Sequence, residues 1–245
     1  MMTDCGTVCP KCNGRGWYFV EYNTVKECEC GIVERERQES KLRFATIPEA
    51  YKDVFLKDWT TKPYNKENKA QIKAIAVSVR NWFENIDEME REGKGFYFWS
   101  DTKGSGKTML TVAIANELIN KYKRFTKFAT SLDILDEIRS TYDSHNEDTE
   151  SKLLEDLVSA EFLVIDDFGT ERVTDWVGEK FYQIINKRYI NKKVTFFTSN
   201  FDLKELKYDE RVKSRIRERS FLAHFPEESV REVKALQENK SLEVE

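Results

Sequence analysis

The sequence predicts an α/β protein in which helices flank a parallel β-sheet, with a small metal-binding module at the N-terminus. Two observations carry this prediction. All five cysteines lie within the first 30 residues of the 245-residue chain. From Asn68 onward, apolar residues at helical spacing alternate with short apolar runs, as expected for helices packed on strands that are buried on both faces. The chain therefore divides into a module held by its cysteines and a larger domain held by a hydrophobic core.

Composition excludes several classes of protein. With 40% hydrophobic and 13% aromatic residues, the chain is too apolar to be disordered. No apolar run approaches the ~18 residues of a membrane helix, and the first residues lack the pattern of a secretory signal, so we expect a cytoplasmic protein with no membrane partner. The formal net charge of −4 averages over local clusters, since residues 118–132 contain four basic and no acidic side chains. The acidic total therefore does not exclude a DNA partner.

The cysteine spacing indicates a structural zinc site. Cys9 and Cys12 form a C-x2-C pair, and Cys28 and Cys30 form a C-x-C pair. Four thiolates close a tetrahedral zinc site with no open position for a substrate, and the metal stabilises a module of about 40 residues whose own core is too small. Cys5 either replaces one of these ligands or is free. The alternative interpretation is a set of reduced surface thiols.

Composition also predicts how the cysteine module is joined to the larger domain. The run from Trp17 to Val20 favours a short hairpin between the two cysteine pairs. From Gly31 a highly charged stretch predicts a linker helix, and the aromatic-rich segment 44–59 predicts an extended strap that docks on the next domain. We therefore divide the chain into three parts: a zinc-binding module over 1–40, a linker and strap over 41–68, and the larger domain over 69–245.

A phosphate-binding loop follows the first predicted strand of the larger domain. A helical pattern from Ile72 to Phe83 precedes an apolar strand over 96–99, and a further helix is expected from Met109 to Tyr122. Between that strand and that helix lies Gly-Ser-Gly-Lys-Thr, which in this context predicts a P-loop. The loop and the start of its helix comprise Asp101, Thr102, Lys103, Gly104, Ser105, Gly106, Lys107, Thr108 and Met109. Backbone N–H groups and the helix dipole favour phosphates here, so we expect ATP or ADP to bind.

Three positions in this loop have specific expectations. Lys107 is expected to bridge the β- and γ-phosphates, and Thr108 to present its hydroxyl to Mg²⁺. Asp101 replaces the first glycine of the usual pattern. Aspartate tolerates a left-handed backbone, so the loop can still close, but a carboxylate that points inward would weaken nucleotide binding.

Polar residues at the ends of two further strands complete the predicted site. The apolar strand 162–165 is followed by Asp166 and Asp167, and the strand 194–199 is followed by Asn200. Because parallel strands end at the same edge of a sheet, we expect these side chains beside the P-loop. We predict that Asp166 binds Mg²⁺, that Asp167 activates the attacking water, and that Asn200 positions this water or senses the γ-phosphate.

Two arginines late in the chain are candidates for action on a neighbouring subunit. After an amphipathic helix over 177–190, the basic stretch 209–219 carries Arg211 and Arg215 four residues apart, on one helix face. An arginine finger stabilises transition-state charge in the site of another subunit. The alternative interpretation is a solvated basic helix.

Together these motifs resemble a known group of ATPases. The P-loop, Leu-Val-Ile-Asp-Asp-Phe-Gly, Thr-Ser-Asn and the late Arg-Val-x-x-Arg-Ile look like the motifs of AAA+ ATPases of the DnaC/DnaI helicase-loader type, over roughly residues 45–225. The resemblance implies an AAA+ P-loop NTPase core over 69–245 and a weak ATPase that an oligomer or DNA stimulates. It also implies that Asp166 and Asp167 form the second acidic motif, that Asn200 is the sensor, and that Arg215 is the finger with Arg211 beside it.

The resemblance also implies partners. Loaders of this type form a spiral or ring oligomer on a hexameric replicative helicase and deliver it onto single-stranded DNA, and their small N-terminal domain binds the helicase. The corresponding location is a bacterial or phage-infected cytoplasm. Lys121, Lys123, Arg124 and Lys127, interleaved with aromatic residues, are a candidate DNA contact, or alternatively a solvated helix end that runs into a core strand.

Three other functions are compatible with the motifs. An IstB-like transposition ATPase would act on duplex DNA, but it has no evident use for the cysteine cluster. A small-molecule P-loop kinase would also leave that cluster unexplained. A non-hydrolysing interaction protein is the third alternative, and Asp101 favours it. The final predicted helix, over 227–237, is short and charged, and no helix-turn-helix pattern follows the core, which argues against an initiator that reads duplex sequence.

Overall fold

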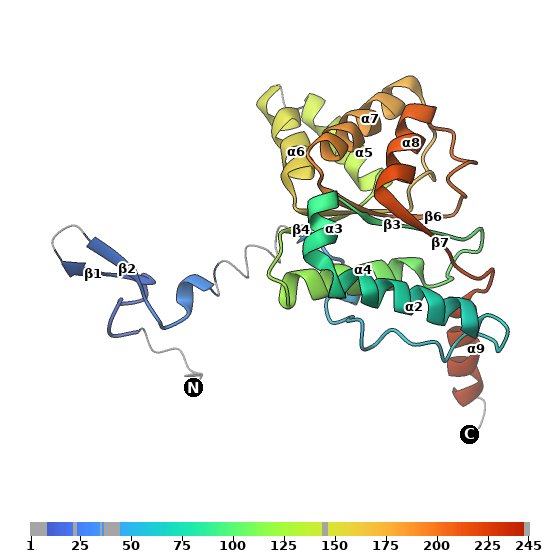
Figure 1. Cartoon of the computed structure of the whole chain (residues 1–245), viewed down its shortest axis with the longest axis horizontal. Helices are drawn as coiled ribbons and strands as arrows, with labels where there is room; N and C mark the ends of the chain where they lie inside the picture. The colour runs from blue at the N-terminus through green and yellow to red at the C-terminus, as the bar shows by residue number, and fades with distance from the viewer. Residues whose placement is uncertain (1–8, 22–23, 35, 37–44, 144–146, 243–245) are drawn as a thin grey trace.

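A five-stranded parallel sheet forms the centre of the larger domain in the computed structural model, which describes residues 9–21, 24–34, 36, 45–143 and 147–242 (Figure 1). The strands lie in the order β4-β5-β6-β3-β7, and all neighbouring pairs are parallel. Their bounds are β3 Gly95–Trp99, β4 Thr126–Thr130, β5 Phe162–Asp166, β6 Val194–Ser199 and β7 Ser220–His224. The predicted α/β class is confirmed.

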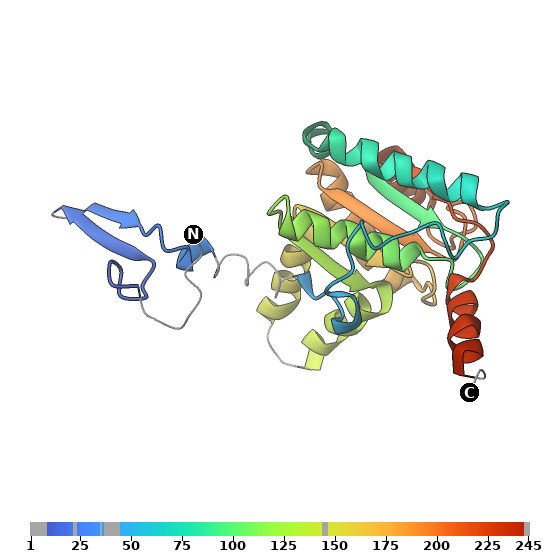
Figure 2. The same ribbon diagram turned by 90° about the horizontal axis from the view of Figure 1, so that it is seen from below.

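Helices cover both faces of this sheet (Figures 1 and 2). Helices α2 and α4 lie on one face, and α5, α6, α7 and α8 lie on the other. The bounds are α2 Lys69–Glu84, α3 Ile86–Glu92, α4 Lys107–Asn120, α5 Ser131–Asp143, α6 Glu147–Ser159, α7 Asp175–Ile190, α8 Glu210–Arg219 and α9 Val230–Leu242. Phe96 and Phe98 pack into one core and Tyr97 into the other, because successive residues of a strand point to opposite faces.

The strand predictions are confirmed at 96–99, 162–165 and 194–199, and β4 contains the core strand expected near Phe128. Strand β7 was not predicted. It lies at the edge of the sheet, where Phe221 and Leu222 are exposed, and it follows α8 without a connecting turn. Its sequence therefore lacks both the continuous apolar run and the turn residues that indicate a strand.

The helix predictions differ from the structure mainly at helix ends. Helix α4 begins at Lys107 rather than Met109, and α7 begins at Asp175, where Thr174 caps it by accepting a hydrogen bond from the backbone N–H of Val177. Helix α9 begins at Val230, whereas a start at residue 227 was expected. None of the helices in the described ranges is long and apolar enough to cross a membrane.

The N-terminal module contains the predicted hairpin. Strand β1 (Trp17–Glu21) pairs with β2 (Thr24–Glu27) in an antiparallel arrangement, with Trp17 opposite Glu27. Residues 32–34 and 36 are helical at the start of the predicted linker helix. The rest of that helix, like Cys5, lies outside the described residues.

The segment between the module and α2 runs along α4, where it includes the 3₁₀ turn η1 (Glu49–Tyr51). The side-chain amide of Asn116, on α4, donates to the carbonyls of Tyr51 and Val54, both at 2.8 Å. Four partly buried apolar side chains of the segment pack against the core: Ile47, Tyr51, Leu56 and Trp59. The segment therefore reaches the start of α2 as a strap fixed to the P-loop helix.

A buried arginine joins α6 and α7 to the start of β6. Arg188, on α7, is 1% exposed, and its guanidinium donates to the carbonyls of Leu157 and Ala160 at 2.8 Å and of Val194 at 2.5 Å. Burial lowers the pKa of Arg188 to about 9, so the group is still charged at neutral pH. The guanidinium therefore supplies buried carbonyls of three different segments with a charged donor.

We predict that Arg188→Met lowers the free energy of unfolding by about 2–4 kcal/mol, because it leaves buried carbonyls without a donor. Urea denaturation measures this change. Arg172→Met is the control, since Arg172 is exposed, and it should change the value by less than about 0.5 kcal/mol. Equal effects of the two substitutions would contradict the structural role of Arg188.

Candidate nucleotide and zinc sites

The P-loop ends in a helix N-terminus that no side chain within the described part of the chain caps. Gly104 and Gly106 have positive φ angles of 78° and 98°, and Gly106 is the residue before α4. No side chain bonds to the N-terminal N–H groups of α4, and no acid lies in its first turn. A Cβ at Gly106 would lie 2.5 Å from the hydroxyl oxygen of Tyr64, so glycine is required here. The free N–H groups and the helix dipole form an anion site.

Lys107 lies inside the loop that precedes it. Its ammonium donates to the carbonyls of Ser100 at 3.1 Å and Thr102 at 3.2 Å, and to the hydroxyl of Ser105 at 3.1 Å. The residue is 5% exposed, and burial lowers its pKa. These three acceptors are neutral, so none of them pairs the ammonium with a negative charge. The ammonium can therefore attract an anion in the adjoining cavity.

Thr108 and Asp166 meet at the end of β5. The Thr108 hydroxyl donates to the carboxylate of Asp166 at 3.0 Å, and the Thr198 hydroxyl donates to it at 2.5 Å. Asp166 is 4% exposed, and burial raises its pKa to about 6. A hydroxyl and a carboxylate oxygen beside a phosphate site are the ligands that Mg²⁺ takes in nucleotide sites.

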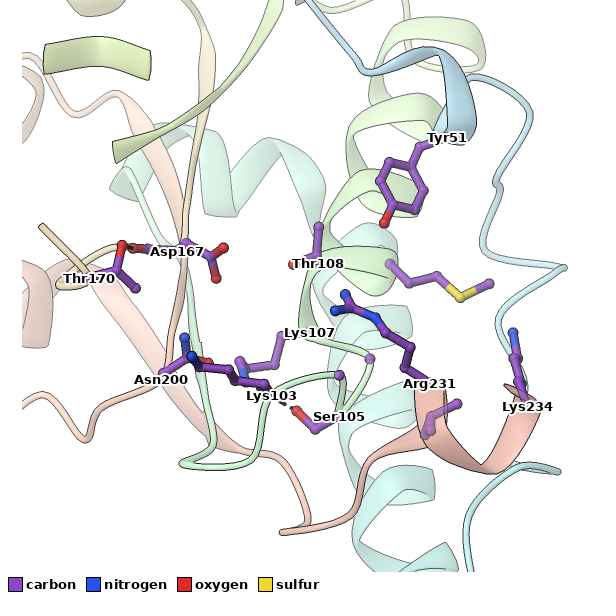
Figure 3. A pocket seen from close by; sticks show the side chains of 14 residues that line it. Tyr51, Lys103, Ser105, Lys107, Thr108, Asp167, Thr170, Asn200, Arg231 and Lys234 are labelled. Carbon is purple, nitrogen blue, oxygen red and sulfur yellow. Dashed lines mark hydrogen bonds between the residues drawn. The ribbon is translucent and has the colours of Figure 1, made fainter. Parts of the chain in front are cut away.

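Lys107 and Thr108 line a cavity of about 450 Å³, a volume suited to a nucleotide, whereas Asp166 is not among its lining residues (Figure 3). The loop residues 103–109 form its floor. In Figure 3 Asp167, Thr170 and Asn200 lie on one side, and Tyr51, Arg231 and Lys234 lie on the other. Four lining residues are cationic and one is acidic, which favours a polyphosphate: Lys103, Lys107, Arg231, Lys234 and Asp167.

Asp101 and Thr102 lie outside the wall of this cavity. Asp101 is exposed and is not among the described residues with positive φ, so its position needs no left-handed backbone and no glycine. The N–H groups of Asp101 and Thr102 donate to the carboxylate of Glu227, at 3.2 and 2.7 Å. The replacement of the first glycine is therefore compatible with a closed P-loop.

Sequence reasoning missed the contribution of the C-terminal segment. Glu227 also accepts a hydrogen bond from the Ser100 hydroxyl at 3.0 Å and pairs with His224 Nε2 at 2.8 Å. Partial burial opposes its ionisation, but the hydrogen bonds from His224, Thr102 and Ser100 outweigh burial and lower the pKa of Glu227 to about 2. This carboxylate fastens the start of α9 to the P-loop, and Arg231 thereby reaches the cavity. No local sequence motif predicts a contact between residues more than 120 positions apart.

Arg211 and Arg215, on α8, do not line the cavity of their own chain. Arg215 donates from Nε to Asn186 Oδ1 at 2.7 Å and stacks on Tyr182, with 5.1 Å between its guanidinium carbon and the ring centroid. Within the described residues Arg215 forms no ion pair, whereas Arg211 pairs with Asp209 at 3.0 Å. Arg215 is thus a positioned cation whose charge is not neutralised by a carboxylate.

The basic cluster before β4 is partly absorbed by the fold. Lys121 pairs with Glu117 and Arg124 with Glu90, and the side chain of Lys127 is buried. Of the three interleaved aromatic residues, Tyr122 stacks on Phe83 and Phe128 is 3% exposed, whereas Phe125 is 43% exposed. The alternative of a helix end that leads into a core strand describes this segment better than a DNA contact.

The four predicted cysteine ligands lie together. The Sγ atoms of Cys9, Cys12, Cys28 and Cys30 are all within 4.8 Å of one another. The distance from Cys9 to Cys28 is 3.8 Å and that from Cys12 to Cys30 is 3.6 Å, against about 3.8 Å for thiolates around tetrahedral zinc. The backbone N–H groups of Cys12 and Lys11 lower the pKa of Cys9 to about 7, which favours the thiolate. The donor set therefore fits structural zinc.

Comparison with known proteins identifies relatives over much of the chain. Residues 24–210 match the family described as IstB-like ATP binding protein. The replicative helicase loader DnaC of Buchnera aphidicola (strain APS) is 31% identical over 156 residues, 63% of this chain and 61% of the loader. The phage-like element PBSX protein XkdC of Bacillus subtilis is 26% identical, over 86% of this chain and 78% of that protein. The chain spans about three fifths of the length of the loaders named DnaC.

Solved structures agree with this assignment. A crystal structure of the DnaC helicase loader matches with a TM-score of 0.63 and 27% identity, over 73% of this chain and all of that one. DnaA of Aquifex aeolicus matches with a TM-score of 0.60 but 16% identity, which supports the AAA+ fold alone. The resemblance to the DnaC/DnaI group is confirmed. The family match over most of its length shows that the chain belongs to the IstB-like ATP binding protein family, with the DnaC and DnaI loaders among its relatives.

Proposed function

We propose that the protein is an ATP-dependent helicase loader, which binds a hexameric replicative helicase and delivers it onto single-stranded DNA. The observation that carries this proposal is the presence, in one chain, of a DnaC-like nucleotide-binding core and a four-cysteine module. The named relatives are replicative helicase loaders. We place the zinc-binding, helicase-interacting module at 1–40, the linker and strap at 41–68 and the ATPase domain at 69–245, in a cytoplasmic protein.

ATP hydrolysis would use the residues around the cavity. Lys107 would bind the β- and γ-phosphates, while Thr108 and Asp166 would hold Mg²⁺, which neutralises phosphate charge when it is bound. Asp167 would accept the proton of the attacking water, and Asn200, which lines the same wall, would orient that water. Arg231 and Lys234 would add positive charge opposite them.

Completion of the site would require a second subunit. Among the described residues that line the cavity the arginine is Arg231, which lies on the side opposite Asp167 in Figure 3, whereas Arg215 lies on α8, outside the cavity. We assign the finger to Arg215 rather than Arg211 because Arg211 is already paired with Asp209. The isolated subunit would then be a weak ATPase, and a spiral or ring oligomer on the helicase, or DNA, would stimulate it.

The exposed face of the zinc-module hairpin is the proposed helicase contact. Trp17 and Phe19, which alternate along β1, are 43% and 73% exposed, and Val25, opposite Phe19, is 51% exposed. An apolar surface of this kind on a small module is typical of a protein-binding site. The cysteine site would hold the two strands in the register that presents it.

A second candidate is an IstB-like ATPase that acts on duplex DNA in transposition. The matched family description favours it. The cysteine module argues for the loader instead, because the hairpin it holds offers a protein-binding surface rather than a basic one.

Lys107→Ala is expected to reduce ATP affinity by at least about tenfold, because it removes the cation that faces the phosphates. Titration with a fluorescent ATP analogue measures the affinity. Lys73→Ala, on the exposed face of α2, is the control and should leave it unchanged. Unchanged affinity in Lys107→Ala would contradict the assigned nucleotide site.

Arg215→Ala is expected to lower the ATPase rate by at least about tenfold with ATP affinity unchanged, because the finger acts on the neighbouring subunit. An equimolar mixture of Arg215→Ala and Lys107→Ala should regain activity, since some interfaces then combine an intact P-loop with an intact finger. Arg211→Ala is the matched control and should retain most of the rate. A mixture that stays inactive would point to action of Arg215 within its own chain.

Cys9→Ser is expected to lower the zinc content from one ion per chain and to weaken helicase binding, while ATP affinity is retained. Metal analysis and a pull-down with the replicative helicase of the source organism measure the two effects. Trp17→Ala should weaken helicase binding but keep the zinc. Full zinc content in Cys9→Ser would refute the site, and undiminished helicase binding in both variants would refute the proposed contact.

A further inference from the structure

A buried glutamate lies next to the proposed water-activating residue. Glu171 is 7% exposed and ends the turn that follows β5. Its carboxylate accepts hydrogen bonds from the Ser131 hydroxyl at 2.5 Å, from the backbone N–H of Gly169 at 3.1 Å and from the Tyr208 hydroxyl. No ion pair among the described residues involves it. Burial of a carboxylate that only neutral donors contact lowers the stability of the folded protein. Stability therefore does not explain why a glutamate occupies this position.

The backbone of Asp167 needs external support. Its φ angle is 52°, in the left-handed region that non-glycine residues disfavour. Its N–H donates to the Thr198 hydroxyl at 2.9 Å, and its carbonyl accepts from the Thr170 hydroxyl at 2.8 Å and the Ser131 hydroxyl at 3.1 Å. The single hydroxyl proton of Ser131 is thus shared between the carbonyl of Asp167 and the carboxylate of Glu171. The position of the glutamate therefore sets the position of the serine hydroxyl.

The same turn is packed against the segment that leads to α8. The ring of Phe168 stacks on Tyr208, with centroids 4.7 Å apart and planes within 10°. A Cβ at Gly169 would lie 2.4 Å from a side-chain methyl of Leu206, so this side chain packs directly on the backbone of the glycine. Tyr208 precedes Asp209, which caps α8 by accepting a hydrogen bond from the N–H of Arg211 at 2.7 Å. The turn is therefore in direct contact with the segment that begins α8.

We propose that Glu171 is a positioning residue that joins the hydrolytic turn to the arginine-bearing helix. Through Ser131 and Gly169 it holds Asp167 in the orientation that faces the cavity. Through Tyr208 it fixes the segment that carries α8 and Arg215. The proposal rests on the proposed ATPase function, and it adds a connection between the nucleotide site of one subunit and the arginine finger that the same subunit offers to its neighbour.

The test separates positioning from binding and from folding. Glu171→Ala is expected to lower kcat for ATP by about 10- to 100-fold, because a small displacement of a catalytic group has effects of this size, while the Kd for Mg-ATP changes less than about twofold. Glu171→Gln keeps an acceptor for Tyr208 and Gly169 and should retain most of the rate. Tyr208→Phe removes one hydroxyl but keeps the stack on Phe168, so it should lower kcat even if Glu171→Ala does not fold.

A double-mutant comparison identifies the residue through which Glu171 acts. With Asp167→Ala as background, adding Glu171→Ala should lower kcat by a smaller factor than it does in the wild-type chain, because the group positioned through Ser131 and Gly169 is already gone. Glu155→Ala, an exposed acid on α6, is the control and should be neutral in both backgrounds. Multiplied losses in the double variant, or a Kd that rises in step with the fall in kcat, would overturn the proposal.

Failure of the proposed function gives a different result. A wild-type protein that hydrolyses ATP but loads no helicase would contradict the loader function and leave the role of Glu171 intact. A wild-type protein without ATPase activity in the presence of helicase and DNA would contradict both. An active wild type with fully active Glu171→Ala and Tyr208→Phe variants would contradict only the role of Glu171.

Discussion

The hydrogen bond between Thr108 and Asp166 is the contact on which the arrangement of the site depends. It joins the first turn of α4, which follows β3, to the end of β5. The two meet because the parallel strands β3 and β5 end at the same edge of the sheet. Thr198, at the end of β6, donates to the same carboxylate and accepts from Asp167, which brings the third strand into register with the other two. The proposed magnesium ligands Thr108 and Asp166, the proposed water-activating Asp167 and the polar end of β6 are thus joined by one small network. The burial that raises the pKa of Asp166 is the energetic cost of this network.

The parts of the fold that were predictable from sequence are those whose cause is local. Strand β5 is apolar along its whole length because both faces are buried, and the glycines of the P-loop stand where positive φ is needed. The cysteine pairs are likewise recognisable because ligand geometry fixes their spacing. Strand β7 was missed because an edge strand needs no continuous apolar run. Asp101 replaces the first glycine of the usual P-loop pattern, which suggests weakened nucleotide binding, yet its backbone adopts no conformation that requires glycine.

Other parts of the site depend on contacts between distant segments and have no sequence signal of their own. Glu227 and Arg231 belong to a charged segment that is indistinguishable from a solvated helix until Glu227 is seen to bind the P-loop. The same holds for Arg124, whose ion pair with Glu90 joins distant segments, whereas the pair of Lys121 with Glu117 spans one turn of α4 and its end. Arg215 could be singled out from Arg211 only by its partners, because the two differ in pairing rather than in sequence context.

We propose that this nucleotide site, completed between subunits, drives the placement of a helicase ring on single-stranded DNA. The most direct measurement is the retention of the source organism's replicative helicase on circular single-stranded DNA, which has no end over which a closed ring can thread. We expect that retention requires this protein together with ATP, and that it falls to the background level with Lys107→Ala. Helicase that loads on the circle equally well without the protein, or with the Lys107→Ala variant, would contradict the claim.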